Sequence, residues 1–316
     1  MKCLVSGATG FIGRSLCRRL VLEGHTVTAL SKSGRPLPDG TPTLALDLAQ
    51  SLPSAEQLQG VDVVFHLAGI AHQHAPDSAY VALNERATVG LAGRCQQAGV
   101  GRFVFLSSVK AMGPARQGEP RAESDCLPPD EPYGRSKWRA ECQLREAFES
   151  GPMNVVIVRP ALVYGPRPKG NLALLARGMR AGLPRPPAGG GRSMIALDDL
   201  VAALLLVASL PLEGVHTWIA ADPRPYSTRF LYDQLRAAAG RGAGLAWLPA
   251  PGWRLAAAVL DLCTGRRGES TYHKLFGTEL YSATALMQAT GWRPAVRFEL
   301  LAPELLRAGS GGEGRT

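Results

Sequence analysis

The 316-residue sequence predicts an α/β fold in which a doubly wound parallel sheet is followed by a smaller α/β lobe. In the first half, short apolar runs alternate with segments whose apolar residues recur at helical spacing. After about Pro166 this alternation gives way to loops rich in Pro, Gly and Arg. We expect residues 1–165 to form the first domain and residues 166–305 the smaller lobe, with some segments returning to the first domain. Residues 306–316 have almost nothing to bury and should be a disordered tail.

The predicted strands are short, almost continuous apolar runs, as expected when both faces of a parallel sheet are covered by helices. The helices between them show apolar residues three and four positions apart. The sheet carries its ligands at the carboxyl ends of its strands, so motifs that come directly after strands are the candidate site. The expected elements are, in order, strand Cys3–Val5, helix Phe11–Glu23, strands Thr26–Leu30, Thr43–Leu46 and Val61–His66, a long helix near Ser78–Ala98, strand Phe103–Ser107, a helix from Tyr133 to about Glu149, strand Val155–Arg159 and, in the second lobe, strand Val215–Ala220.

A glycine-rich motif, Gly7-Ala8-Thr9-Gly10-Phe11-Ile12-Gly13, joins the first strand to the first helix. Glycines let the backbone approach a pyrophosphate closely, and the start of the helix offers free N–H groups and the positive end of its dipole. The G-x-x-G-x-x-G spacing differs from the usual G-x-G-x-x-G fingerprint, and glycine-rich turns also close ordinary loops. The context of strand, turn and helix predicts a Rossmann-type site for a dinucleotide.

A second motif, Tyr133-Gly134-Arg135-Ser136-Lys137, comes after a proline-rich loop and places a phenol and an ammonium on one helix face. Tyrosine has an ordinary pKa of ~10, too high for a base at neutral pH. A positive charge at ~4 Å in an effective dielectric of ~20 contributes about 4 kcal/mol, or roughly three pKa units. In most Y-x-x-x-K sequences the tyrosine simply packs at the start of a helix beside a solvated lysine. The glycine-rich turn upstream favours a catalytic pair here. We therefore expect Lys137 to lower the pKa of Tyr133.

Composition excludes several other classes of protein. The net charge is +9, yet the basic residues are dispersed arginines and no stripe interleaved with aromatic residues predicts nucleic-acid binding. No apolar stretch reaches the ~20 residues of a membrane span, and no secretion signal is visible, so we expect a cytoplasmic protein. The six cysteines are scattered and predict neither a disulfide framework nor a zinc site. His72 and His74 lack a third ligand at suitable spacing, so no metal site is predicted.

From Met1 to about Pro303 the sequence resembles the extended short-chain dehydrogenase/reductases, and within them the enzymes that act on nucleoside-diphosphate sugars. Besides the two motifs above, the segments that carry the resemblance are His66-Leu67-Ala68-Gly69, Asn84, Leu106-Ser107-Ser108, Arg159-Pro160-Ala161-Leu162-Val163-Tyr164-Gly165-Pro166, Arg192-Ser193-Met194-Ile195 and Asp198-Asp199-Leu200. The resemblance implies that Ser108 bonds the reacting oxygen, that Tyr133 gives or takes its proton, and that Lys137 holds the nicotinamide ribose.

The resemblance also implies a set of cofactor contacts. An acidic residue normally comes after the second strand and selects NAD, but this chain has Ser31-Lys32-Ser33-Gly34-Arg35 there, which favours NADP over the alternative, NAD. Asp47 does not discriminate between them, and His66 is expected to be structural. The implied contacts are Gly7, Gly10, Phe11, Ile12, Gly13, Ser31, Lys32, Arg35, Asp47, Leu48, Leu67, Ala68, Gly69, Asn84, Tyr133, Lys137, Pro160 and Val163.

For the substrate, the resemblance implies a UDP-sugar bound by Ser108, Lys110, Tyr133, Asn171, Leu172 and Arg192. Ala196 stands where many relatives have His, and Arg185-Pro186-Pro187 lacks the aromatic residue on which some relatives stack the base. The identity of the base as uracil is therefore implied by the family resemblance alone. The resemblance further implies a possible homodimer through a four-helix bundle of the helices Ser78–Ala98 and Lys137–Phe148.

The two residues after Ser108 narrow the choice among the reactions that the family catalyses. Sugar-nucleotide dehydratases carry Asp-Glu after the catalytic hydroxyl, whereas this chain has Val109-Lys110. That leaves hydride transfer at one carbon, expected to be C4. The cofactor loop, Met112 where 4-epimerases usually have Tyr, and the run Ser107 to Lys110 favour reduction of a UDP-4-keto-6-deoxy-N-acetylhexosamine for surface polysaccharide. A UDP-hexose 4-epimerase with tightly bound NAD is the close alternative. A steroid- or flavonoid-type reductase and a non-catalytic NADP sensor are further ones.

Overall fold

The computed structural model describes residues 1–71, 75–114, 118–166, 170–263 and 271–307. Its centre is a sheet of seven strands in the order β10-β6-β5-β4-β1-β2-β3, with every neighbouring pair parallel. The predicted doubly wound α/β fold is confirmed. The strands are β1 (Lys2–Ser6), β2 (Thr26–Ser31), β3 (Leu44–Ala45), β4 (Val63–His66), β5 (Arg102–Leu106), β6 (Asn154–Pro160) and β10 (Val215–Ala220).

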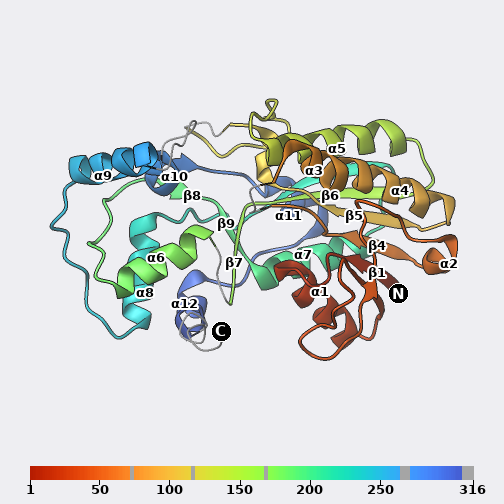
Figure 1. Cartoon of the computed structure of the whole chain (residues 1–316), viewed down its shortest axis with the longest axis horizontal. Coiled ribbons are helices and arrows are strands. Elements are labelled where there is room, and N and C mark those ends of the chain that lie inside the picture. The colour runs from red at the N-terminus through yellow and green to blue at the C-terminus, as the bar shows by residue number, and fades with distance from the viewer. Residues whose placement is uncertain (72–74, 115–117, 167–169, 264–270, 308–316) are drawn as a thin grey trace.

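Helices cover both faces of this sheet (Figure 1). On one face, α1 (Phe11–Leu22) and α7 (Leu197–Ser209) share an apolar core with side chains such as Val5 and Phe65. On the other face, α4 (Ala87–Gln97) and α5 (Pro132–Phe148) pack on the alternate side chains, such as Leu4 and Val64. Because successive strand residues point to opposite faces, one apolar run supplies both cores.

The predicted long helix is three joined segments: α3 (Asp77–Tyr80), a π-helical stretch η1 (Val81–Arg86) and α4. The π-helical stretch is a difference from the prediction, and such stretches are frequent at functional sites. Between β3 and β4 lies the short helix α2 (Ala55–Leu58).

The strand Val215–Ala220 lies elsewhere than predicted. It was expected in the second lobe, but as β10 it pairs in parallel with β6 at the edge of the main sheet. The helix α7 also returns to that sheet, where it packs against α1. Hydrophobic pattern identifies a strand but not the sheet that it joins, which explains the error.

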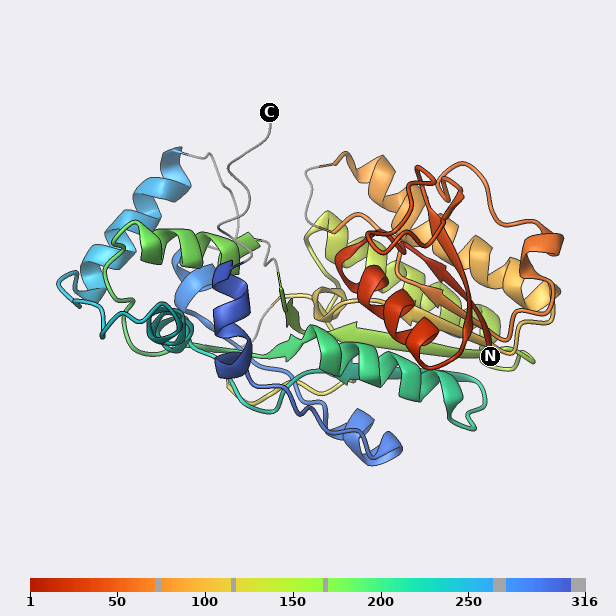
Figure 2. The same ribbon diagram turned by 90° about the horizontal axis from the view of Figure 1, so that it is seen from below.

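The smaller lobe stands beside the sheet (Figure 2) and is mainly helical around a core that includes Tyr164, Tyr226 and Phe298. Two short parallel pairs lead into it, β7 with β9 and β8 with β11. The predicted tail starts too early, because the last helix continues to Arg307; residues 308–316 lie outside the described residues. The remaining elements are β7 (Leu162–Tyr164), β8 (Gly191–Arg192), β9 (Met194–Ala196), β11 (Thr278–Glu279), η2 (Val109–Met112), α6 (Gly170–Arg180), α8 (Thr228–Ala238), α9 (Ala250–Cys263), α10 (Thr271–Phe276), α11 (Thr284–Thr290) and α12 (Phe298–Arg307).

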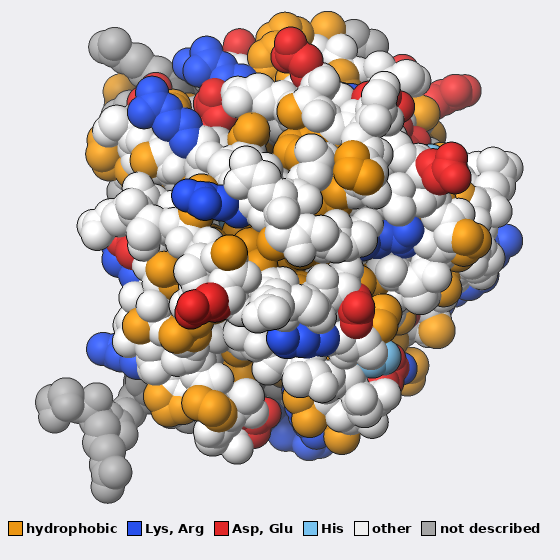
Figure 3. All heavy atoms as spheres, turned by 90° about the vertical axis from the view of Figure 1, so that its right-hand side faces the viewer, with side chains coloured by type: hydrophobic (Ala, Val, Ile, Leu, Met, Phe, Trp, Pro, Cys, Tyr) orange, Lys and Arg blue, Asp and Glu red, His pale blue; other side chains and the backbone are white. Residues whose placement is uncertain are grey.

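Exposed apolar side chains gather on one element of the surface. Within the described ranges, α9 exposes Leu255, Val259, Leu260 and Leu262, whereas α3, η1, α4 and α5 expose no large hydrophobic side chain. The dimer expected through those helices therefore stays a prediction. On the face shown in Figure 3, acidic and basic side chains are interspersed. None of the helices that the structure describes is long and apolar enough to cross a bilayer.

Candidate active site

The glycine-rich turn comes directly after β1, and its shape depends on close backbone contacts. Gly7 has φ +70°, and a Cβ there would lie 2.7 Å from the amide nitrogen of Ala68. A Cβ on Gly13 would lie 2.2 Å from the Gly7 carbonyl oxygen, and the Gly10 N–H donates to that same oxygen at 2.9 Å. These glycines are therefore needed to fold the turn against the loop after β4, a packing role that the motif alone does not reveal.

The start of α1 suits an anion. No side chain caps this helix and its first turn holds no acidic residue, while Thr9 and Gly10 are exposed. Unpaired N–H groups and the positive end of the helix dipole therefore face outward at the turn. The turn and helix fit the pyrophosphate of a dinucleotide.

Asn84 ties the loop after β4 to α5. Its Nδ2 donates to the Ile70 carbonyl at 2.9 Å and to the Ser136 hydroxyl at 3.1 Å, while its Oδ1 accepts from the Ile70 N–H at 2.8 Å. A Cβ on the exposed Gly69 would lie 2.9 Å from Asn84 Oδ1 and 3.3 Å from Lys137 Nζ. The absence of a side chain at Gly69 thus leaves Lys137 room beside this loop.

The structure brings Ser108 and Tyr133 together at the carboxyl end of β5. Ser108 is the N-cap of η2 and accepts from the Lys110 N–H at 3.2 Å. Tyr133, the second residue of α5, is half-buried, and the Ser108 side chain is close enough to lower the pKa of its hydroxyl. A Cβ on Gly134 would lie 2.5 Å from the Lys110 carbonyl oxygen, so this glycine lets the start of α5 pack against η2.

Lys137 is buried one helical turn beyond Tyr133. Its Nζ donates to the Leu106 carbonyl at 2.9 Å and lies 4.5 Å from the centre of the Phe105 ring. Burial lowers its pKa to about 7. Near neutral pH Lys137 is therefore present in both its protonated and its neutral form.

The prediction that Lys137 lowers the pKa of Tyr133 is wrong for the protein without cofactor. Burial raises the pKa of Tyr133, the bond from Ser108 opposes that rise, and the nearby Tyr80 adds to it. Desolvation disfavours the charged form of each group, so phenol and amine both tend towards neutrality. Sequence spacing reveals the pair but not its burial.

Two polar neighbours of the site are held in internal networks. The Ser107 hydroxyl donates to Glu141 Oε1 at 2.5 Å, and Glu141 pairs with the buried Arg159 at 2.6 Å. Ser107 therefore points away from Ser108. His66 lies between the hydroxyls of Ser6 (2.7 Å) and Thr88 (2.9 Å), and burial lowers its pKa to about 3. It is neutral at physiological pH and occupies a structural position.

One of the two cationic side chains in the loop after β2 forms an ion pair with a neighbouring carboxylate. The Ser31 hydroxyl is buried and accepts a hydrogen bond from the Gly34 N–H at 3.0 Å, so it stabilises the turn. Lys32 Nζ lies 2.9 Å from Asp47 Oδ2, and this contact lowers the pKa of Asp47. The exposed Arg35 has no ion pair within the described ranges. Of the two predicted cations, only Arg35 is thus free of an acidic partner.

The two cationic side chains that are predicted to bind the substrate both pair with Glu279, a residue that the sequence motifs do not identify. Lys110 Nζ lies 2.8 Å from Glu279 Oε1, and Arg192 Nη1 lies 3.0 Å from Glu279 Oε2. Nothing local in the sequence marks Glu279, because its partners lie 169 and 87 positions away. Leu172 is buried in the second lobe's core, so only its backbone could face a ligand; the side chain of Asn171 lies outside the described residues.

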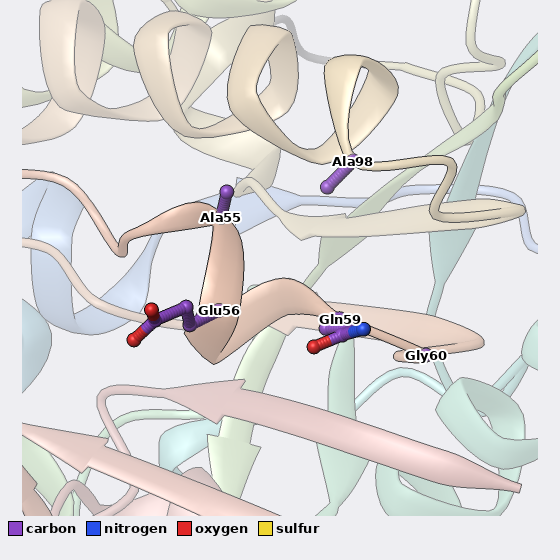
Figure 4. Close-up of a pocket in the computed structure, with 5 residues that line it drawn as sticks. All are labelled: Ala55, Glu56, Gln59, Gly60 and Ala98. Carbon is purple, nitrogen blue, oxygen red and sulfur yellow. The ribbon is translucent and has the colours of Figure 1, made fainter.

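The other predicted cofactor positions border the same edge of the sheet. Phe11 and Ile12 are partly buried at the start of α1, and Leu67 and Ala68 come directly after β4. Pro160 ends β6, Val163 is half-buried in β7, and Leu48 is buried beside Asp47. The hollow in Figure 4 lies at the opposite, amino edge, between α2 and Ala98, and its lining of Ala55, Glu56, Gln59, Gly60 and Ala98 offers no comparable chemistry.

No group of His, Cys, Asp or Glu suited to a metal ion occurs among the residues described. The loop histidines of the sequence, His72 and His74, lie outside them.

A family model described as "NAD dependent epimerase/dehydratase family" matches residues 3–220. The chain belongs to this family. This epimerase/dehydratase family member is 30% identical over 303 residues to a UDP-glucose 4-epimerase of Vibrio cholerae, covering 92% of this chain and 90% of that protein. It is 29% identical over 252 residues to a 2-alkyl-3-oxoalkanoate reductase of Stenotrophomonas maltophilia, covering 76% of each. A solved structure, MoeE5 in complex with UDP-glucose and NAD, matches with a TM-score of 0.76 at 25% identity, covering 98% of this chain and 99% of that one.

The family confirms the expected extended short-chain dehydrogenase/reductase type and the use of a nicotinamide dinucleotide. The dinucleotide in that structural relative is NAD.

Proposed function

We propose that the protein reduces the 4-keto group of a UDP-4-keto-6-deoxy-N-acetylhexosamine, with NADP preferred over NAD. The observation that carries this proposal is that Ser108 and Tyr133 lie together at the carboxyl end of β5, where burial raises the pKa of Tyr133 and the neighbouring Ser108 side chain opposes that rise. A phenol with a raised pKa stays protonated at neutral pH, which suits an acid that protonates a carbonyl oxygen better than a base that deprotonates an alcohol.

In the proposed reaction the cofactor supplies the hydride that C4 receives. Ser108 and Tyr133 both hydrogen-bond the keto oxygen, and the Tyr133 hydroxyl transfers its proton to that oxygen as the C–H bond forms. Lys137, whose pKa is about 7, lies one helical turn from Tyr133 and can supply the proton that restores its phenol after each cycle. The backbone of the glycine-rich turn and the start of α1 would hold the pyrophosphate.

The substrate class is supported by charge at the same edge of the sheet. Lys110 lies two residues beyond Ser108, and Arg192 reaches the same carboxylate from the smaller lobe. Arginine binds diphosphate through several charge-assisted hydrogen bonds, so the pair suits a nucleoside-diphosphate sugar. A steroid- or flavonoid-type substrate carries no diphosphate and would not use these cations.

A 4-epimerase is the second candidate, because the Vibrio cholerae relative that matches nearly the whole chain bears that name. An epimerase returns the hydride to the opposite face of the sugar and keeps its cofactor through turnover. A reductase exchanges its cofactor in every cycle.

The two candidates are separated by denaturing the purified protein, identifying any released dinucleotide, and then following NADPH and NADH with the keto-sugar. The proposal expects an empty site and oxidation of NADPH only when UDP-4-keto-6-deoxy-N-acetylhexosamine is present. Stoichiometric NAD released on denaturation, with interconversion of UDP-hexoses and no use of external cofactor, would establish the epimerase instead.

A further inference from the structure

Glu279 bridges the two lobes of the site through its two carboxylate oxygens. Oε1 accepts from Lys110 Nζ at 2.8 Å and from the Tyr281 hydroxyl at 2.9 Å, while Oε2 accepts from Arg192 Nη1 at 3.0 Å. Lys110 belongs to η2, the turn that Ser108 caps, and Arg192 belongs to β8 in the smaller lobe. One carboxylate therefore joins the catalytic turn to the predicted diphosphate contact.

Burial places the carboxylate behind its cations. The side chain of Glu279 is 8% exposed, that of Arg192 21% and that of Lys110 41%. Burial alone would raise the pKa of Glu279, but Lys110 and Arg192 hold it below its ordinary value, so the group is ionised at neutral pH. A buried ion pair is weak evidence for a gain in stability, because desolvation offsets much of the attraction. The arrangement calls for another explanation.

The backbone fixes Glu279 next to Arg192. β11 and β8 are parallel, Glu279 is the register partner of Arg192, and the Ser193 N–H donates to the Glu279 carbonyl at 3.0 Å. Gly190 permits this approach: it has φ +68°, and a Cβ there would lie 2.1 Å from the Phe276 carbonyl oxygen. The carboxylate is thus held by a rigid backbone pair.

Both cations keep donors for a second anion. Glu279 takes one of the five guanidinium N–H groups of Arg192, another reaches the His273 carbonyl at 3.3 Å, and the buried Nε has no hydrogen-bond partner within the described structure. Lys110 uses one of its three ammonium protons on Glu279. An unpaired buried donor is unfavourable, and an incoming acceptor removes that cost.

We propose that Glu279 is a positioning residue, which holds Lys110 and Arg192 in the orientation that receives the diphosphate of the substrate. This inference rests on the proposed nucleotide-sugar substrate. Without Glu279 the two cations repel each other and lose their common anchor, so each has to be ordered again when the ligand binds. Glu279 itself touches neither substrate nor cofactor.

The test measures the binding of UDP to the full-length protein by calorimetry, a readout independent of turnover. Glu279→Gln keeps the size of the side chain and removes its charge. We expect the Kd for UDP to rise at least tenfold in this variant, and KM for the nucleotide sugar to rise more than kcat falls. Glu299→Gln is the matched control: Glu299 pairs with Arg224 at 2.7 Å in the same lobe, without a contact to this cluster, and the loss of its charge should leave the Kd unchanged.

Tyr281→Phe gives a second variant in case Glu279→Gln does not fold, since it removes only a hydroxyl that donates to Glu279. We expect it to weaken UDP binding about threefold. Folded variants that bind UDP as tightly as the wild type, or more tightly, would overturn the positioning role, even if they melt at a lower temperature. A wild-type protein that does not bind UDP would instead overturn the proposed substrate class.

Discussion

The cofactor end and the substrate end of the candidate site are held by different forces. At the cofactor end, Gly7 and Gly13 bring backbone segments into direct contact, and the first turn of α1 carries no acidic residue. At the substrate end, Lys110 and Arg192 are held by the carboxylate of Glu279. Backbone packing depends little on salt or pH, whereas interactions between charges depend on both. Substitutions at the first end should therefore damage folding, and substitutions at the second should damage recognition.

The largest effect is expected where the two ends meet. Tyr133→Phe removes the proton donor and preserves the ring, so turnover should fall by ~10²–10⁴-fold, the usual contribution of a general acid. The measurement is kcat with NADPH and the keto-sugar, with cofactor affinity as the control, which should stay within about twofold. Turnover retained at the wild-type rate would refute the assignment of Tyr133.

At the cofactor end, Gly7→Ala should lower the free energy of unfolding by at least ~2 kcal/mol, because it combines a left-handed backbone with the contact to Ala68. Gly24→Ala is the matched control. Gly24 has φ +79° with nothing within 4 Å of a new Cβ, so it should lose only the ~1 kcal/mol backbone penalty. Urea unfolding compares the two variants, and equal losses would show that the contact with Ala68 has no cost.

Stability should also depend on pH through Lys137. Its pKa is about 7 in the folded protein and near ~10.4 when unfolded, so between these values the unfolded chain binds more protons. The free energy of unfolding therefore rises with pH across this window, by roughly 1 kcal/mol per pH unit from this group. Below pH 7 the full destabilisation is present. The difference between the wild type and Lys137→Met, measured in urea at pH 7 and pH 9, should show this slope, and parallel pH profiles would contradict it.

The smallest effect concerns the choice of cofactor. Arg35→Ala should weaken the binding of NADPH by up to about tenfold and leave NADH unchanged, because an exposed cation contributes little beyond its contact with a 2′-phosphate. Fluorescence titration with both cofactors measures this, and NADH serves as the internal control. An equal loss for the two cofactors would assign Arg35 to a contact that they share.

The two ends also differ in how far sequence could predict them. At the cofactor end the turn, Tyr133 and Lys137 come from local motifs, and Asn84 and Ser108 come from the resemblance to the family. The parallel sheet necessarily brings the carboxyl ends of its strands together. The direction of the pKa shift of Tyr133 could not be predicted in this way, because it depends on burial, which spacing does not reveal.

The substrate end could be predicted only in part. Lys110 and Arg192 are identified singly, but their meeting on Glu279 requires the pairing of β8 with β11, two strands of two residues each. Such short strands leave no periodic pattern in a sequence. The same limit explains β10, whose apolar run predicts a strand but not its place beside β6.

The most direct test of the proposed C4 reduction uses NADPH that carries deuterium at C4 of the nicotinamide. The protein is incubated with this cofactor and UDP-4-keto-6-deoxy-N-acetylhexosamine, and the sugar product is analysed by mass spectrometry and NMR. Two cofactors are compared, each deuterated on one face of the nicotinamide. We predict one deuterium at C4 of the sugar with one of these cofactors and none with the other. A product that carries no deuterium from either labelled cofactor, or no product while UDP-hexoses are interconverted, would contradict the proposed reduction.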